Sequence, residues 1–103
     1  MLDLFTPDLE RPIILAPLAG VSDAPFRRIC ARNGADLTYV EMLSSAAINH
    51  QNRRTLEMLD RHDEEGRVGV QVTGRQADEV AQAVSFLDST SYDTIDLNMG
   101  CPV

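Results

Sequence analysis

The segment 95–102 carries the most reactive side chain of this sequence, the thiol of Cys101. Two apolar residues alternate there with Asp96 and Asn98, so a strand would have one apolar and one polar face. A glycine before the cysteine and a proline after it constrain the backbone on both sides. The pattern predicts a strand that ends in a turn holding a functional thiol, and a small packed cysteine fits the same residues.

A second polar strand face is predicted in segment 68–73, the clearest alternation in the chain. Its three valines share one face and should meet helices, whereas Gln71 and Thr73 share the other. Gln71 is either a polar residue satisfied within a sheet or a member of a site. Glu41 follows another predicted strand as a possible site residue without an assigned role, and Asp96 could instead cap a neighbouring helix.

These side chains require a parallel α/β framework to bring them together. We expect strands at 13–16, 37–40, 68–73 and about 92–98, the first buried on both faces because its apolar run is continuous. Helices should run from the Ser22-Asp23 cap to Asn33-Gly34, from Ser44-Ser45 through Leu59, and over about 75–87. Repeated strand, helix and strand with short connections predicts parallel pairing.

Two parallel architectures remain, an open doubly wound sheet and part of a (β/α)8 barrel. Polar residues on one face of the last two strands favour the barrel, whose active sites lie at the carboxyl ends of the strands. A complete barrel needs roughly 250 residues, so we expect the N-terminal half of one, with about four strands and outer helices.

The helix faces can also be predicted from their spacing. Phe26, Ile29 and Cys30 should form the apolar side of the first helix, with Cys30 in a packing role. The last helix should pack through a stripe comprising Ala77, Val80, Ala81, Val84 and Leu87. We expect the pairs Arg27-Arg28 and Arg53-Arg54 to lie on solvated faces, with phosphate contacts as the alternative. Segment 62–66 should be a surface loop with a solvated His62.

Composition narrows the class of protein. The 103 residues are 44% hydrophobic and carry 9 basic against 16 acidic side chains, a net charge of -7 that opposes tight RNA binding by this chain alone. Two cysteines are too few for a disulfide framework or a zinc site, so we expect no metal. The sequence has no apolar run long enough to span a bilayer and no secretory signal, and a soluble cytoplasmic protein is expected.

Three motifs in order, APLAGVSDAPFR at 16–27, VQV at 70–72 and DLNMGCP at 96–102, resemble the tRNA-dihydrouridine synthase family. The resemblance implies that residues 1–103 are the N-terminal part of an FMN-binding (β/α)8 barrel, without its later strands and helical tRNA-binding domain. It also implies a set of site residues. The flavin would be held by Pro17, Leu18, Ala19 and Gln71. Asn98 would lie beside the target base, and Cys101 would be the general acid.

The implied reaction reduces a uridine of tRNA to 5,6-dihydrouridine, with NADPH as the reductant of FMN. Hydride would pass from flavin N5 to C6 of the uracil, and Cys101 would protonate C5. We expect the 103-residue chain alone to bind FMN weakly and to be inactive. Its open sheet edges should favour self-association.

Alternatives to this reading come from two classes. One is another FMN-dependent barrel oxidoreductase, similar to dihydroorotate dehydrogenase, against which the turn at 98–102 argues. The other is a non-catalytic half-barrel that binds a partner protein or dimerises. A sequence-specific RNA-binding module is a weaker third, because the chain is acidic and has only five aromatic residues, three Phe and two Tyr.

Overall fold

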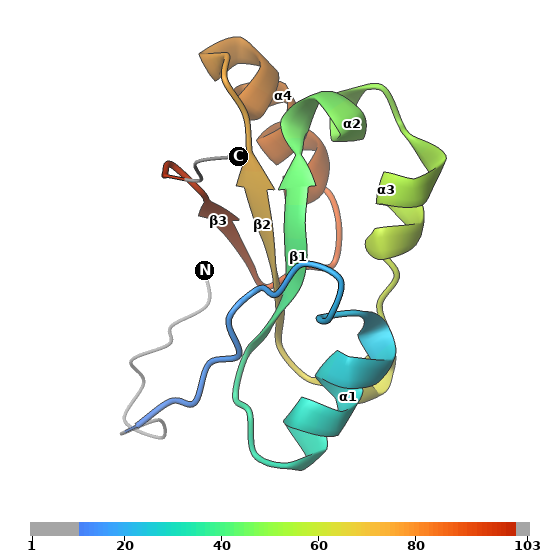
Figure 1. The fold of residues 1–103 in the computed structure, drawn as a ribbon, viewed down its shortest axis with the longest axis vertical. Coiled ribbons are helices and arrows are strands. Elements are labelled where there is room, and N and C mark those ends of the chain that lie inside the picture. The colour runs from blue at the N-terminus through green and yellow to red at the C-terminus, as the bar shows by residue number, and fades with distance from the viewer. Residues whose placement is uncertain (1–10, 101–103) are drawn as a thin grey trace.

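Three parallel strands form a sheet in the order β1-β2-β3 in the computed structural model, which describes residues 11–100. They are β1 (Thr38–Ser44), β2 (Val68–Thr73) and β3 (Thr94–Leu97). The helix α1 (Ala24–Arg32) precedes β1. The crossovers contain α2 (Ser45–Asn49), α3 (Arg53–Met58) and the 3-10 turn η1 (Asp63–Glu65), and then α4 (Ala77–Asp88) (Figure 1). The predicted alternation of strands and helices is therefore confirmed.

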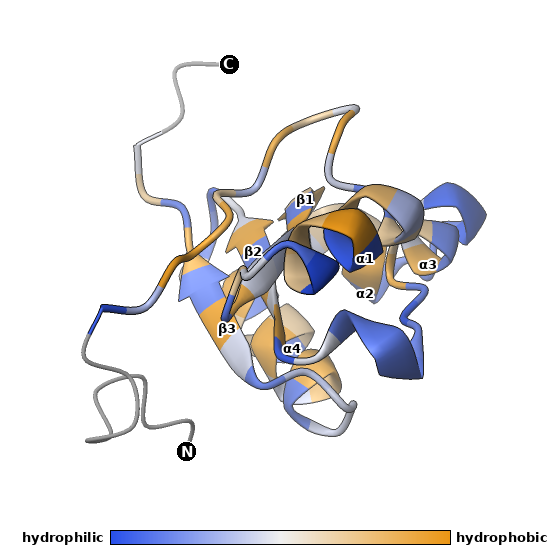
Figure 2. Ribbon diagram, turned by 90° about the horizontal axis from the view of Figure 1, so that it is seen from below, coloured by the Kyte–Doolittle hydropathy of each residue, from blue (hydrophilic) through white to orange (hydrophobic). Residues whose placement is uncertain are grey.

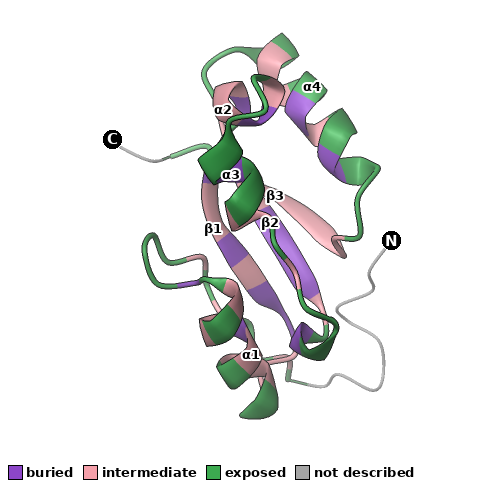
Figure 3. Cartoon of the chain, turned by 90° about the vertical axis from the view of Figure 1, so that its right-hand side faces the viewer, coloured by how far each residue is buried: buried purple, intermediate pink, exposed green. Residues whose placement is uncertain are grey.

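The helices lie on one side of the sheet (Figure 2). The three valines of β2 are at most 1% exposed and face this side, as predicted. Figure 3 shows the buried residues along β1 and β2 beneath the helices. The rest of the core cluster comprises Val40, Leu43, Ile48, Ala83 and Leu87. A parallel sheet covered by helices on one face and polar on the other is the arrangement of a barrel wall, so the fold is that of part of a (β/α)8 barrel.

The first predicted strand is not formed as expected. Only Ile14 makes a parallel bridge, to Leu37, and the Leu15 N–H donates to the Leu37 carbonyl at 2.9 Å. Ile13 is 62% exposed and Ile14 46%, so the prediction of burial on both faces was wrong. The segment is joined to the edge of the described sheet by one bridge, and a continuous apolar run indicates only a tendency to be buried.

The predicted helical region from Ser45 through Leu59 is divided into two short helices. Gln51 has a positive φ of 50°, which a regular right-handed helix excludes. The Asn52 side chain then accepts the Thr55 N–H at 3.2 Å and caps α3. The break turns α3 back along the sheet, as Figure 1 shows.

The ends of α1 are as predicted, but its buried face is not. Asp23 caps the helix by accepting the Phe26 N–H at 2.9 Å, and Gly34 ends the turn with a φ of +100°. Ile29 is 57% exposed, whereas Arg27 is 1% exposed. The interpretation of Phe26, Ile29 and Cys30 as the packed side was therefore wrong for Ile29, because α1 turns Arg27 toward the protein instead.

Arg27 is buried because its guanidinium meets three acceptors. It donates to the carbonyls of Ser22 and Asp60, each at 2.8 Å, and its Nη2 lies 3.0 Å from Glu65 Oε1. The prediction of a solvated Arg27 was wrong for this reason. The surface-loop interpretation of 62–66 holds for the exposed His62 but not for Glu65, which is 1% exposed. A buried ion pair thus joins the start of α1 to η1.

The packing side of α4 was predicted only in part. Leu87 is 1% exposed and Ala83 is fully buried, whereas Ala77 and Ala81 are exposed. On another side, α4 is bonded to α2: Ser45 Oγ donates to Glu79 Oε1 at 2.6 Å, and Asn49 Nδ2 donates to the Glu79 carbonyl at 2.8 Å. Among residues 11–100, no helix is long and apolar enough to cross a membrane.

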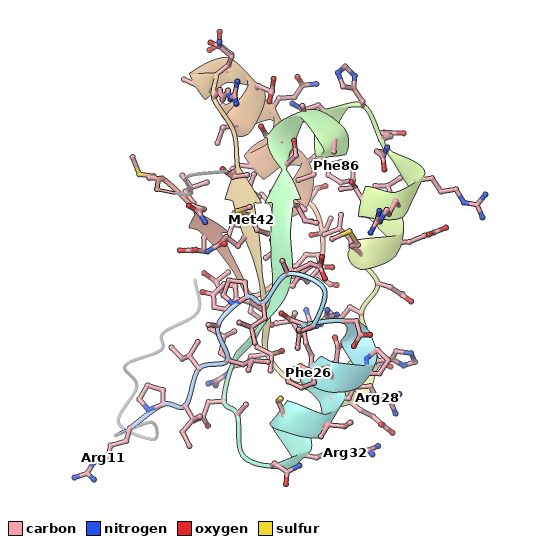
Figure 4. All side chains as sticks on the ribbon, viewed as in Figure 1. Arg11, Phe26, Arg28, Arg32, Met42 and Phe86 are labelled. Carbon is pink, nitrogen blue, oxygen red and sulfur yellow. The ribbon has the colours of Figure 1, made fainter. Side chains whose placement is uncertain are left out.

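Adjacent glutamates offer a test of the buried ion pair. Glu65→Ala should lower the free energy of unfolding by about 3–5 kcal/mol, because it leaves the Arg27 charge buried without its partner. Glu64→Ala is the matched control, because Glu64 pairs on the surface with Arg28 and Arg32, which Figure 4 labels, and its loss should change the stability far less. Urea unfolding measures both, and equal effects would contradict this role of Arg27.

Candidate functional site

A β-bulge in β1 sets the geometry of the polar face. Val40 pairs with Val70 and Leu43 with Val72, so the two residues Glu41 and Met42 stand opposite the single residue Gln71. A bulge bends its strand and re-aims a side chain. Met42 therefore reaches across the sheet (Figure 4), and its Sδ lies 3.3 Å from Asn98 Nδ2 on the far side of β2.

Hydrogen bonds connect the polar side chains of β2 and β3. Gln71 lies directly opposite Asp96 in the strand register, and its Nε2 donates to Asp96 Oδ2 at 2.6 Å. Asn98 Nδ2 donates to Gln71 Oε1 at 3.3 Å. Asp96 does not cap a helix, which was the alternative considered from the sequence, because its partner is Gln71.

Asn98 also shapes the turn that leads toward Cys101. Its backbone N–H donates to the Val72 carbonyl at 2.8 Å, which extends the β2–β3 pairing by one residue. Its side-chain Oδ1 accepts the Gly100 N–H at 3.0 Å. Asn98 therefore fixes the end of β3 through its backbone and the first residues of the turn through its side chain.

Tyr39 forms the layer below Gln71 on the same face. It packs over Gly69, where an added Cβ would lie 2.4 Å from the tyrosine ring. Burial raises the pKa of Tyr39, the negative charge of Asp96 raises it further, and a hydrogen bond with Thr94 opposes both. Across β2, Tyr39 is level with Thr94, and Asp96 lies two residues further along β3 on the same face.

The turn after the first apolar run is held by two side chains. Ser22 Oγ accepts the Leu18 N–H at 2.5 Å and donates to the Leu18 carbonyl at 2.9 Å. Glu41 Oε2 accepts the Gly20 N–H at 3.3 Å, and Gly20 has a φ of 72° that favours glycine. Glu41, which had no role from the sequence, therefore ties this turn to β1.

A cavity of about 530 Å³ opens at the carboxyl ends of the strands. Its lining includes Ser44, Thr73 and Asn98 from the strand ends, with Arg75 and Gln76 before α4. This position is where the sequence predicts the barrel mouth, and where enzymes of this architecture hold their ligands.

The structure brings some of the predicted site residues together. Gln71 and Asn98 are in contact. Leu18 and Ala19 are exposed and Pro17 is half-buried. Within residues 11–100 no hydrogen bond joins their turn directly to Gln71, and the connection runs through Glu41 and β1. Cys101 lies outside the described residues.

Sequence reasoning missed Met42 and Tyr39 as members of this face. Alternation along β1 places Tyr39 on the face opposite to that of Val40, and this signal could have identified Tyr39. Met42 would alternate onto the valine side in a regular strand, and the bulge alone moves it, so no sequence pattern indicated its position. In the part of the chain that the structure covers, no three His, Cys, Asp or Glu side chains gather as a metal site.

The fold and site define part of a barrel whose polar residues meet at the carboxyl ends of its strands. Comparison with known proteins agrees: residues 14–103 match the family model described as dihydrouridine synthase. The chain is 42% identical over 94 residues to tRNA-dihydrouridine synthase B of Pasteurella multocida, covering 91% of this chain and 28% of that protein.

Two further relatives are also named as tRNA-dihydrouridine synthases or as similar to them. Identity is 40% over 97 residues to the tRNA-dihydrouridine(47) synthase [NAD(P)(+)]-like protein of Oryza sativa subsp. japonica, covering 93% of this chain and 14% of that protein. The identity is 39% over 90 residues to tRNA-dihydrouridine synthase B of Xanthomonas campestris pv. campestris, and the match covers 87% of this chain and 27% of that protein. The chain belongs to the dihydrouridine synthase family, and it spans less than a third of the length of these relatives.

The two tyrosines of the chain allow a test of the polar face. Asp96→Asn should lower the pKa of Tyr39 toward its ordinary value of about 10, because it removes the nearby negative charge. The pKa of Tyr39 is measured from tyrosinate absorbance during an alkaline titration. The measurement uses a Tyr92→Phe background so that one tyrosine remains, because Tyr92, whose pKa is raised to about 12 mainly by burial, would add its own absorbance. As the folded-state pKa of Tyr39 is raised, its contribution to stability is lost as pH rises above about 10.

The control for this titration is Asp88→Asn, which removes an exposed carboxylate at the end of α4 and should leave the pKa of Tyr39 unchanged. Equal pKa values of Tyr39 with and without the Asp96 carboxylate would contradict the described face.

Proposed function

We propose that this chain contributes the flavin-facing and base-facing residues of an enzyme that reduces uridine in tRNA to 5,6-dihydrouridine. The carrying observation is the hydrogen-bonded row of Asp96, Gln71 and Asn98 at the carboxyl ends of parallel strands, in a chain of the dihydrouridine synthase family. The names of the relatives supply the substrate class, tRNA, and the reaction.

The residues fit FMN as the cofactor. Gln71 Nε2 carries two hydrogens and one is used by Asp96, so within the described residues the second has no partner. The flavin ring edge offers carbonyl oxygens and ring nitrogens that accept such a hydrogen. The exposed turn formed by Pro17, Leu18 and Ala19 offers apolar surface and backbone at the neighbouring strand end.

When bound, FMN would supply the hydride, with NADPH as its reductant. The residues of this chain would then position and protonate the base. Gln71 orients the cofactor by donating a hydrogen bond. Asn98 lies beside the base and accepts the Gly100 N–H. Cys101, the next residue in the sequence, donates the proton to uracil C5.

Further barrel segments would be needed for the reaction. A (β/α)8 barrel takes roughly 250 residues, and this chain has 103. We therefore expect the isolated chain to be inactive and tRNA to bind mainly through other regions of the full-length protein. Self-association through the sheet edges and a cytoplasmic location stay predictions.

The test of this function is dihydrouridine formation by the full-length protein that carries these residues, supplied with FMN, NADPH and unmodified tRNA. Cys101→Ala should lower the rate by about 10²–10⁴-fold, the usual contribution of a positioned acid. Cys30→Ala is the matched control, because Cys30 is a half-buried free thiol on α1 and should leave the rate unchanged.

A folded, flavin-loaded wild type that forms no dihydrouridine would overturn the proposed function. Oxidation of dihydroorotate by the same preparation would instead favour the other class of FMN barrel. Equal rates for wild type and Cys101→Ala would show that Cys101 is not the general acid, without contradicting the proposed reaction.

A further inference from the structure

We propose that Asp96 is a positioning residue that sets the direction of the row of side-chain hydrogen bonds that runs from β3 to the Gly100 N–H. The role of Asp96 in catalysis rests on the proposed function, whereas the direction of the hydrogen bonds is a property of this chain that does not depend on that function. The row of groups is Asp96, the Gln71 side chain, the Asn98 side chain and the Gly100 N–H, named here the polar relay.

The direction of the relay follows from the chemistry of its first member. A primary amide can present either its oxygen or its NH₂ to a neighbour, so neither Gln71 nor Asn98 has a direction of its own. A carboxylate only accepts hydrogen bonds. Asp96 Oδ2, 2.6 Å from Gln71 Nε2, therefore selects the orientation in which the amide nitrogen faces β3.

The remaining members follow this choice. With its nitrogen on Asp96, Gln71 presents Oε1 to Asn98 Nδ2 at 3.3 Å. The Asn98 nitrogen also meets Met42 Sδ at 3.3 Å, and sulfur is a weak acceptor, so both contacts favour the same orientation. Asn98 Oδ1 is then left to accept the Gly100 N–H at 3.0 Å. A reversed amide at Gln71 would leave the Asn98 and Gln71 nitrogens facing each other.

This direction determines what the site offers a ligand. With Oε1 turned toward Asn98 and one Nε2 hydrogen on Asp96, the second Nε2 hydrogen is what Gln71 presents to a group bound at the strand ends, so Gln71 acts there as a donor. Asp96 itself lies directly opposite Gln71 on β3, and its Oδ2 is taken up by the Gln71 amide. Asp96 would thus act on cofactor and base through Gln71 and Asn98, and on Cys101 through the turn at Gly100.

The relay can be tested in the isolated chain without any cofactor, by NMR of isotope-labelled protein at one fixed pH. Asp96→Asn replaces an acceptor that fixes the direction, so it should produce a shared shift of the side-chain amide signals of Gln71 and Asn98 and of the Gly100 N–H signal. Asp88→Asn, which removes an exposed carboxylate, should leave all of these signals in place.

Signals that stay fixed in Asp96→Asn, or that move equally in Asp88→Asn, would overturn the proposal. The double variant Gln71→Glu with Asp96→Asn covers the case in which the single variant does not fold. It restores a carboxylate–amide pair with reversed direction, and its position-71 carboxylate still accepts from Asn98. The Asn98 and Gly100 signals should then lie near their wild-type positions, and their displacement would also overturn the relay.

A second readout separates the relay from the proposed function. In the flavin-loaded full-length protein, Asp96→Asn should change the flavin absorption spectrum and lower kcat by about tenfold or more, the usual effect of losing a supporting hydrogen bond. An unchanged spectrum and kcat would overturn the positioning role. Absence of bound flavin in the wild type, with the shared NMR shift present, would reject the proposed function and retain the relay.

Discussion

The two-sided character of a β-strand is the constraint on which the rest of this structure depends. Successive side chains point to opposite faces, so covering one face with helices commits the valines of β2 to the core and Gln71 to the other face. Because β3 runs parallel with Asp96 opposite Gln71, the polar groups meet in register. The bulge in β1 then adds Met42 to this face without disturbing the buried pairing of Leu43 with Val72.

The features that depend on local pattern could be predicted from the sequence. Alternation identified the buried valines and the polar face of Gln71, and the side chain of Asp23 identified the start of α1. The parallel order followed from the repeated strand and helix lengths. Gln71 and Asn98 were expected in the site and do lie in contact, while Cys101 lies outside the described residues.

Features that depend on tertiary contacts could not be predicted. Arg27 is buried because carbonyls from Ser22 and Asp60 and the Glu65 carboxylate converge on it, and these groups lie up to 38 residues away in the chain. Met42 is placed by an irregularity in pairing, which no periodicity records. The exposure of Ile13 and Ile14 reflects their place at the sheet edge, whereas an apolar run indicates only a tendency to be buried.

We propose that the polar face at the strand ends is where the full-length protein holds its flavin beside the target base. A crystal structure of that protein with FMN should show the flavin ring at the carboxyl ends of β1, β2 and β3, with Gln71 Nε2 donating to it and Gln71 Oε1 accepting from Asn98. A flavin on the helix side of the sheet, or a reversed Gln71 amide whose oxygen accepts from the ring, would exclude this arrangement.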